Sequence, residues 1–257
     1  MMIRKDQQIK KSWIFPSVTS VARAARAARA VCVLLIFSCL CFKITSGEPR
    51  IGEKLIYDVK LGMISAGTQV VCVADKVKIS DHETYRITSH TTTTPFFSIF
   101  YRMDNHIETL IDCETFSIRK MTKEINEGSF HRKDIMLFDL ESGRGFIQRD
   151  GYAETINIPP AVLDIASIPY YLRELDLKIG QVISMDIITD GGIKKYAAVV
   201  ESLDQIKTPL MKFKAYRVVE KTEKITVWIA NDESRLPVKI QIGTNVGEIT
   251  GILKKVE

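Results

Sequence analysis

Polar and apolar residues alternate with a period of two along most of the chain after residue 50. In KLIYDVKL, residues 54–61, one face carries Leu55, Tyr57, Val59 and Leu61, while the intervening positions are mostly charged. This alternation is typical of a half-buried β-strand. Similar segments recur at intervals of roughly 10 to 13 residues, separated by turns that contain Gly, Asn or Asp. The pattern predicts long antiparallel meanders.

One segment breaks the alternation, IPPAVLDIASIPYYLRELDLKIG at residues 158–180. Its apolar residues recur at steps of three and four, which predicts one main helix over about 163–176 with a single apolar face. That face consists of Ile165, Ile168, Leu172 and Leu175. Asp164 or Ser167 can cap the helix, and Pro169 fits best in its first turn, where the missing N–H costs least. The helix therefore begins near Ser167 or is kinked there.

A long antiparallel sheet curls, and its concave apolar face must be covered by other side chains. We therefore predict a mostly β fold, a single antiparallel β barrel or half-barrel of about 11–14 strands that curls around the main helix. The sequence contains no low-complexity linker and no evident repeat, so residues 48–257 are expected to form a single β-rich domain.

An aromatic run lies in TTTTPFFSIFYRMD, residues 91–104, and predicts a short helical segment near 95–101. Two interpretations are open. The run is a flap over an apolar cavity or a patch that touches lipid, or it plugs one end of the barrel, since aromatic side chains bury a large area. If the barrel holds a ligand, the residues expected to bind it are Phe96, Phe97, Phe100, Tyr101, Ile165, Ile168, Leu172 and Trp228.

Residues 1–47 are expected to be a leader that does not belong to the fold. A basic start is followed by an apolar run from Ala30 to Phe42 and then by small residues, as in a secretory signal peptide. The run is short for a membrane-spanning helix, which needs about 20 apolar residues. Cleavage after Gly47 is the first interpretation. Lipid attachment at Cys39 and an uncleaved anchor are the alternatives, and all three place the protein in the periplasm or cell envelope.

The leader also explains the net charge of the chain. It carries eight of the 36 Lys and Arg and one of the 31 Asp and Glu, so 28 positive and 30 negative side chains remain. The whole-chain charge of +5 thus becomes −2 for the rest. No basic surplus is left to neutralise a phosphate backbone, and nucleic-acid binding is not expected.

Two cysteines remain outside the leader, Cys72 and Cys113. In an oxidising compartment they could form one disulfide, and the alternative is two buried free thiols in apolar strands. The four histidines are widely separated in sequence and lack HxH or HExxH spacing, so we expect surface positions on strands and no metal site. No cofactor motif is present.

The stretch VWIANDESRLPVKI, residues 227–240, brings two acids close to an Arg. Apolar strand patterns flank Asn231–Ser234, whose composition is typical of a turn, and Pro237 fits a strand start or an edge. The acids are therefore expected at an exposed turn and not in a catalytic cleft. No other segment carries a nucleophile motif, and no catalytic residue is predicted.

Three segments carry a resemblance to the family of domain of unknown function 3108, which are exported bacterial proteins. They are GEKLIYDVKLGMISAGTQ (52–69), LDIASIPYYLRELDLKIGQ (163–181) and VWIANDESRLPVKI (227–240), and Pro169 departs from the usual apolar residue. The resemblance spans roughly 52–255 and implies an antiparallel β fold in the envelope without naming a reaction. More loosely, the last segment is similar to periplasmic lipoprotein carriers, whose half-barrel holds acyl chains.

We therefore expect an exported, non-enzymatic protein of the cell envelope, soluble or tethered through its leader, that binds an acyl chain or another amphiphile. The site would be an apolar cavity between the concave sheet and the helix. One alternative is an assembly or scaffold protein of the envelope that has a packed core and contacts a protein partner. Another is a hydrolase of envelope polymers, for which Asp164 and Glu174 are the only acids to name.

Overall fold

The computed structural model describes residues 47–189, 192–244 and 247–257. The chain divides into two units, Met1–Ile44 and Thr45–Glu257, and only the second is described. The predictions for the leader, including lipid attachment at Cys39 and an uncleaved anchor, lie outside the described residues. Among the residues described, no helix has the length and hydrophobicity needed to cross a membrane.

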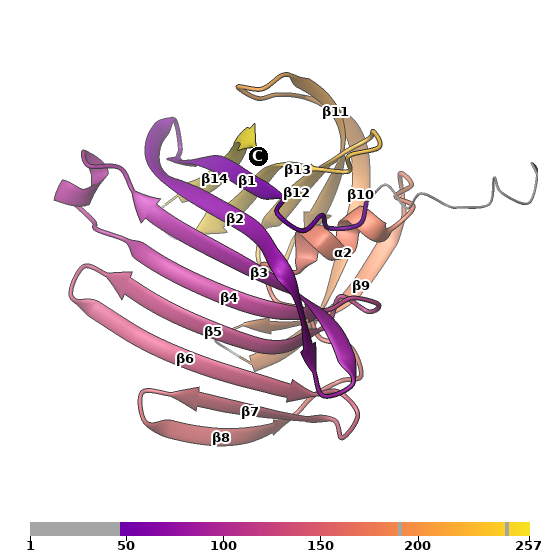
Figure 1. Ribbon diagram of the computed structural model, residues 1–257. Coiled ribbons are helices and arrows are strands. Elements are labelled where there is room, and N and C mark those ends of the chain that lie inside the picture. The colour runs from indigo at the N-terminus through magenta and orange to yellow at the C-terminus, as the bar shows by residue number, and fades with distance from the viewer. Residues whose placement is uncertain (1–46, 190–191, 245–246) are drawn as a thin grey trace, which may run out of the picture. The chain divides into compact units, whose positions relative to one another are not determined.

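Fourteen strands form one sheet in which every pair of neighbours is antiparallel (Figure 1). The strands before the helix are β1 (Lys54–Leu61), β2 (Ile64–Ile79), β3 (His82–Thr93), β4 (Asp104–Asp112), β5 (Ile118–Glu127), β6 (Phe130–Asp139), β7 (Arg144–Arg149) and β8 (Tyr152–Asn157). Those after it are β9 (Val182–Thr189), β10 (Gly192–Lys207), β11 (Lys212–Glu220), β12 (Ile225–Ala230), β13 (Pro237–Thr244) and β14 (Gly247–Val256).

The first and last strands meet in the middle of this sheet. β1 pairs with β14, so that one wing runs from β1 out to β8 and the other from β14 out to β9. β8 and β9 do not pair with each other, and the sheet is therefore open. The predicted mostly β fold is confirmed in its half-barrel form, as one continuous sheet.

A short segment after β8 joins the two wings at one end. Ile118 of β5 donates its N–H to the carbonyl oxygen of Val162 at 2.9 Å. The next residue, Leu163, forms a parallel bridge with Ile187 of β9, and its N–H donates to Asp186 at 2.8 Å. Two residues thus satisfy backbone groups of both wings and narrow the gap that the open sheet leaves.

The main helix, α2, spans Ile168–Glu174. Ser167 is its N-cap. The backbone N–H of Ser167 donates to a carboxylate oxygen of Asp164 at 2.8 Å, and the backbone N–H of Asp164 donates to the Ser167 hydroxyl at 2.9 Å. Pro169 sits in the first turn, as expected. The predicted start near Ser167 is confirmed, whereas the broader range of 163–176 is too long, because Leu175 already has an extended backbone.

Two arginines fix α2 at the end of the sheet where β1 begins and where β12 turns into β13. Arg173 forms a bidentate ion pair with Glu53, the residue before β1, and both side chains are buried. Arg235, in the turn after β12, donates to the carbonyl oxygens of Arg173 and Leu175, which the end of the helix leaves without helical partners. Burial alone would lower the pKa of Arg173, but its bonds to Glu53 raise that pKa above the ordinary value, so the guanidinium stays charged.

The turn 231–236 has the predicted structure. Asp232 accepts hydrogen bonds from the backbone and hydroxyl of Ser234, and Pro237 begins β13. The turn acids are exposed, as expected for a polar turn. The sequence did not indicate that Arg235 of this turn donates hydrogen bonds to the C-terminal end of α2.

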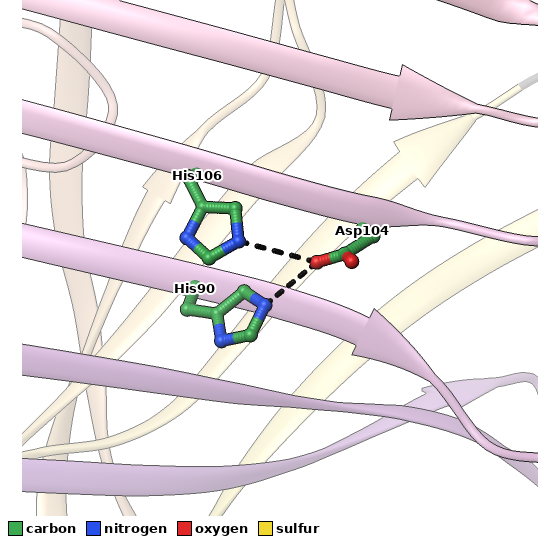
Figure 2. Close-up of side chains that lie close together, drawn as sticks. All are labelled: His90, Asp104 and His106. Carbon is green, nitrogen blue, oxygen red and sulfur yellow. Dashed lines mark hydrogen bonds and ion pairs between the residues drawn. The ribbon is translucent and has the colours of Figure 1, made fainter.

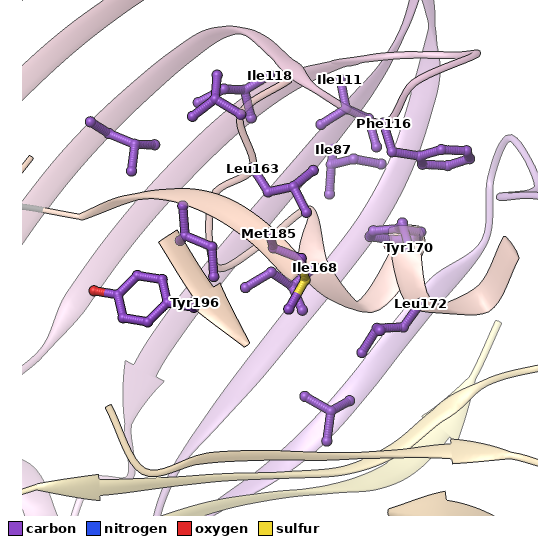
Figure 3. Close-up of a cluster of buried hydrophobic side chains, with 14 of the residues drawn as sticks. Ile87, Ile111, Phe116, Ile118, Leu163, Ile168, Tyr170, Leu172, Met185 and Tyr196 are labelled. Atoms are coloured by element: carbon purple, nitrogen blue, oxygen red, sulfur yellow. The ribbon is translucent and has the colours of Figure 1, made fainter. Parts of the chain in front are cut away.

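Most buried apolar side chains form one core between the concave face and α2 (Figure 3). Ile168, Tyr170 and Leu172 of α2 face strand residues such as Ile87 and Met185 in this core. A second, smaller core contains Trp228 together with Leu55, Tyr57, Phe213, Ala215, Ala230, Val238 and Leu253.

Candidate functional site

The concave face and α2 do not pack solidly against each other, and a cavity of about 570 Å³ lies between them. Its lining is mainly aliphatic and comes from both wings as well as from α2. Representative lining residues are Leu55, Val71, Ile107, Leu172, Met185 and Val227. Cavities of this volume, apolar with a few polar groups, are typical of small-molecule sites.

The end of the cavity next to α2 is the more apolar one. The register between β11, β12 and β13 aligns Val218, Val227 and Ile240 in one row across the sheet. On the other wing Leu55 lies opposite Val71 near the start of β1, which Arg173 ties to the helix through Glu53. Asp164 is the polar exception at this end, and its carboxylate is already bonded to Ser167 and Thr109.

Polar groups from both wings also line the cavity. Gln69 pairs with Tyr57 in the middle of β1 and donates to the Ser89 hydroxyl at 3.0 Å. Lys123 lies across from Ile107 on the same wing. On the opposite wing, Glu220 ends β11, and Glu223 in the following turn accepts a bond of 2.9 Å from Tyr196. All these polar residues line the cavity, so its aliphatic wall carries a small set of polar groups.

Burial is the first cause that raises the pKa of Tyr196, and its bond to Glu223 adds to the shift. The phenol therefore stays protonated and able to donate. Because Glu223 is exposed, this pair marks the solvent-facing side of the lining.

Three of the residues predicted to bind a ligand line the cavity: Ile165, Ile168 and Leu172. The other five, Phe96, Phe97, Phe100, Tyr101 and Trp228, are not part of its lining. Trp228 lies on β12 beside Val227, and successive strand residues point to opposite faces. Its indole donates to Asp204 at 2.9 Å, and Lys239 lies 4.3 Å over its ring. Ligand binding by any of these eight residues stays a prediction.

The aromatic run does not plug the barrel. A short 3-10 helix, η1 (Phe97–Ile99), is present as predicted, but Phe96, Ile99 and Phe100 are 63%, 77% and 75% exposed. The interpretation as a plug is wrong because β3 and β4 stay paired out to Thr93, which bonds to Met103, and the residues between them extend past the end of the sheet. The exposed run remains a candidate contact surface.

The two acids named for hydrolysis do not share the cavity. Asp164 lines it, and Glu174 at the end of α2 does not. Burial raises the pKa of Glu174, and the nearby Glu48 adds to the effect. Cys72 and Cys113 are two free, half-buried thiols, which is the alternative to the disulfide, and burial raises the pKa of the Cys113 thiol.

A cluster on the outer face was missed by the sequence analysis. His90 of β3 and His106 of β4 stack with ring centroids 3.8 Å apart, and both rings direct a nitrogen at Asp104 (Figure 2). The hydrogen bond from His90 is the first cause that lowers the pKa of Asp104, so this carboxylate is charged at neutral pH. The histidines occupy surface strand positions, as expected, but these two are not isolated. Only the hairpin register could have paired residues so far apart in sequence.

Comparisons with known proteins address the family and the fold of the chain. The family model described as protein of unknown function (DUF3108) matches residues 56–254, which confirms the resemblance seen in the sequence. None of the curated proteins matches the chain.

Among solved structures, the β-barrel-like protein of domain of unknown function DUF1849 from Brucella abortus has a TM-score of 0.54 at 10% identity, covering 82% of this chain and 98% of that chain. This similarity shows the fold alone. A protein from Bacteroides fragilis described as exported, with a YmcC-like fold, has a TM-score of 0.39 at 8% identity and covers 82% of this chain and 97% of that chain. The latter score is too low to carry an argument.

Proposed function

The chain belongs to the DUF3108 family, whose description names no activity, and we propose that it binds an acyl chain or another amphiphile in the cavity beneath α2. The leader pattern supports an exported protein of the cell envelope, where such ligands are abundant. The observation that carries the proposal is the cavity itself, about 570 Å³ in a core that a scaffold protein would be expected to fill.

The distribution of polarity in the cavity favours an amphiphile over a compact polar ligand. An acyl chain would lie toward α2, against Leu172, Val227 and Leu55. Its polar head would lie toward Gln69, Lys123 and the Tyr196–Glu223 pair, which supply both donors and acceptors. A uniformly polar ligand would place some of its polar groups against the aliphatic part of the cavity wall, where they would lack hydrogen-bond partners.

Two alanines on β10 provide a matched test. Ala198 is buried and lines the cavity, whereas its neighbour Ala197 is exposed on the opposite face of the same strand. Ala198→Phe puts a ring into the cavity, and Ala197→Phe adds the same ring outside it. We expect uptake of a fluorescent fatty acid to fall about tenfold or more in the first variant and to stay unchanged in the second.

Native mass spectrometry after mild extraction measures the same property without a probe. The wild type should carry an added amphiphile mass that Ala198→Phe lacks. A clean ligand-free mass together with no uptake of the fluorescent probe would refute the proposal, as would equal uptake by both alanine variants.

The exposed aromatic run favours a second candidate, contact with another envelope protein. Phe96, Ile99 and Phe100 present apolar area to solvent, and such patches often mark interaction sites. Under this proposal Phe96→Ser with Phe100→Ser would abolish co-purification of one defined envelope partner and leave fatty-acid uptake unchanged. Retained co-purification would exclude the run as the contact surface.

A further inference from the structure

The pairing of β3 with β4 places two histidines and an aspartate, side chains of the types that bind metals, on one patch. His90 lies directly opposite His106, and Asp104 precedes His106 by two residues, so all three share one face. The adjacent residues Ser89 and Ile107 line the cavity. The cluster therefore points away from the cavity, on the outer face of the sheet.

The distances in the cluster are close to those of a coordinated ion. The Nε2 atoms of His90 and His106 lie 2.8 Å and 3.3 Å from the same Oδ1 atom of Asp104. One ligand atom from each residue fits within 4.8 Å of the others. Tetrahedral zinc with bonds of about 2.0–2.1 Å holds neighbouring ligand atoms about 3.3–3.4 Å apart. Only small side-chain movements would be needed, and both rings already face the shared point (Figure 2).

We propose that His90, Asp104 and His106 bind one divalent transition-metal ion of the Zn²⁺ class on the outer face of the sheet. Two imidazoles and one carboxylate suit such ions and are a poor set for Ca²⁺ or Mg²⁺, which prefer oxygen ligands. The side chains are about half exposed, so solvent completes the coordination. Two paired strands hold the ligands, and such elements position ligands better than loops do.

The charged neighbours of the cluster pair with each other. Glu124 of β5 lies directly across from His106 in the register, on the same face, and adds a second carboxylate to that of Asp104. Lys133 pairs with Glu124 at 2.7 Å and not with Asp104, so the carboxylate within the cluster stays available. Glu124 and Lys133 thus frame the cluster without competing for its ligand atoms.

Another histidine, His82, also lies near two carboxylates, but an arginine occupies the place that a metal ion would need. His82 lies 3.4 Å from Asp112 and 2.9 Å from Glu141. Arg119 bonds to both of these carboxylates, at 2.9 Å and 3.0 Å, and already supplies the positive charge. A metal ion there would face a guanidinium, which excludes this cluster from the proposal.

The test is a titration of the full chain with Zn²⁺ by calorimetry, after removal of bound metal with a chelator. We expect one ion per chain, with affinity that falls as pH drops, because the imidazoles must be neutral to bind. Asp104→Asn and His106→Ala should each weaken binding about tenfold or more. Substitution with Co²⁺ should give a visible absorption band in the wild type that both variants lose.

His131→Ala is the matched control, since His131 is also an exposed strand histidine and its ring hydrogen-bonds to the Asn126 side chain. It should bind Zn²⁺ like the wild type. Circular dichroism of the metal-free variants separates lost ligands from lost folding, and the near-isosteric Asp104→Asn keeps the test valid if His106→Ala unfolds. Binding weaker than about 100 μM, or equal binding by wild type and Asp104→Asn, would overturn the proposal and leave a hydrogen-bonded surface cluster only.

Discussion

Breaking the buried ion pair between Glu53 and Arg173 should destabilise the protein strongly. Their side chains are 7% and 1% exposed, and two hydrogen bonds join them. Glu53→Gln keeps the shape but leaves a guanidinium buried without a counter-charge, which costs about 3–5 kcal/mol. Because domains are stable by only about 5–15 kcal/mol, this is a large share of the total.

Urea unfolding followed by tryptophan fluorescence measures the effect, since Trp228 is the only Trp after the leader and is buried. The midpoint of thermal unfolding should fall by about 6–20 °C for a domain of this size. The double variant Glu53→Leu with Arg173→Met removes both charges and should recover to within about 1 kcal/mol of the wild type.

Lys54→Ala is the control, because Lys54 and Glu257 form an ion pair at 2.9 Å whose side chains are 41% and 37% exposed. Its loss should cost less than about 1 kcal/mol. If Glu53→Gln costs no more than Lys54→Ala, the pair does not hold the helix in the way described. If the double variant is as unstable as Glu53→Gln, the cost comes from shape and not from the uncompensated charge.

Three further predictions concern single side chains. The pKa of Glu174 is raised on folding. Such a carboxyl group adds stability that is full below its unfolded pKa and is lost as the pH rises through its folded pKa. Glu174→Gln should therefore raise the unfolding midpoint at pH 7 and leave it unchanged below about pH 4. An unchanged midpoint at pH 7 would contradict this. Gly67→Ala would put the new Cβ 2.4 Å from a carbonyl oxygen of β3 and should lower the free energy of unfolding by about 1–3 kcal/mol. At Gly251 the nearest atom is 3.8 Å away, so Gly251→Ala should be tolerated, and equal stabilities of the two variants would refute the argument. Cys72 and Cys113 should both be alkylated in urea but only slowly in the folded protein, as mass spectrometry can check, and a disulfide in the purified chain would appear as resistance to alkylation without reductant.

Local signals in the sequence predicted the elements well where the chemistry is local. Pro169 in the first turn of α2, the polar turn before Pro237 and the alternation in β1 depend on neighbours in sequence. The half-barrel followed from the number of alternating segments, since a long antiparallel sheet curls.

Prediction failed where the outcome depends on register and on the ends of strands. Trp228 was predicted to bind a ligand but is not part of the cavity lining, because the period-two alternation does not tell which face of β12 is the concave one. One interpretation buried Phe96 and Phe100 as a plug, because aromatic side chains bury a large area. They are exposed because they lie beyond the point where β3 and β4 separate. His90 and His106 are neighbours only through the hairpin that joins β3 to β4.

The alternation that builds the sheet also separates the two proposed sites. On β3 and β4, Ser89 and Ile107 face the cavity while His90 and His106 face outward, so one pair of strands supplies both surfaces. Side chains on opposite faces do not touch across the sheet, and substitutions that leave the backbone pairing intact should not couple. The loss of Zn²⁺ binding in Asp104→Asn should therefore leave fatty-acid uptake unchanged, and Ala198→Phe should leave Zn²⁺ binding unchanged. If either variant alters both measurements, the backbone of β3 or β4 has moved and the two sites are not independent.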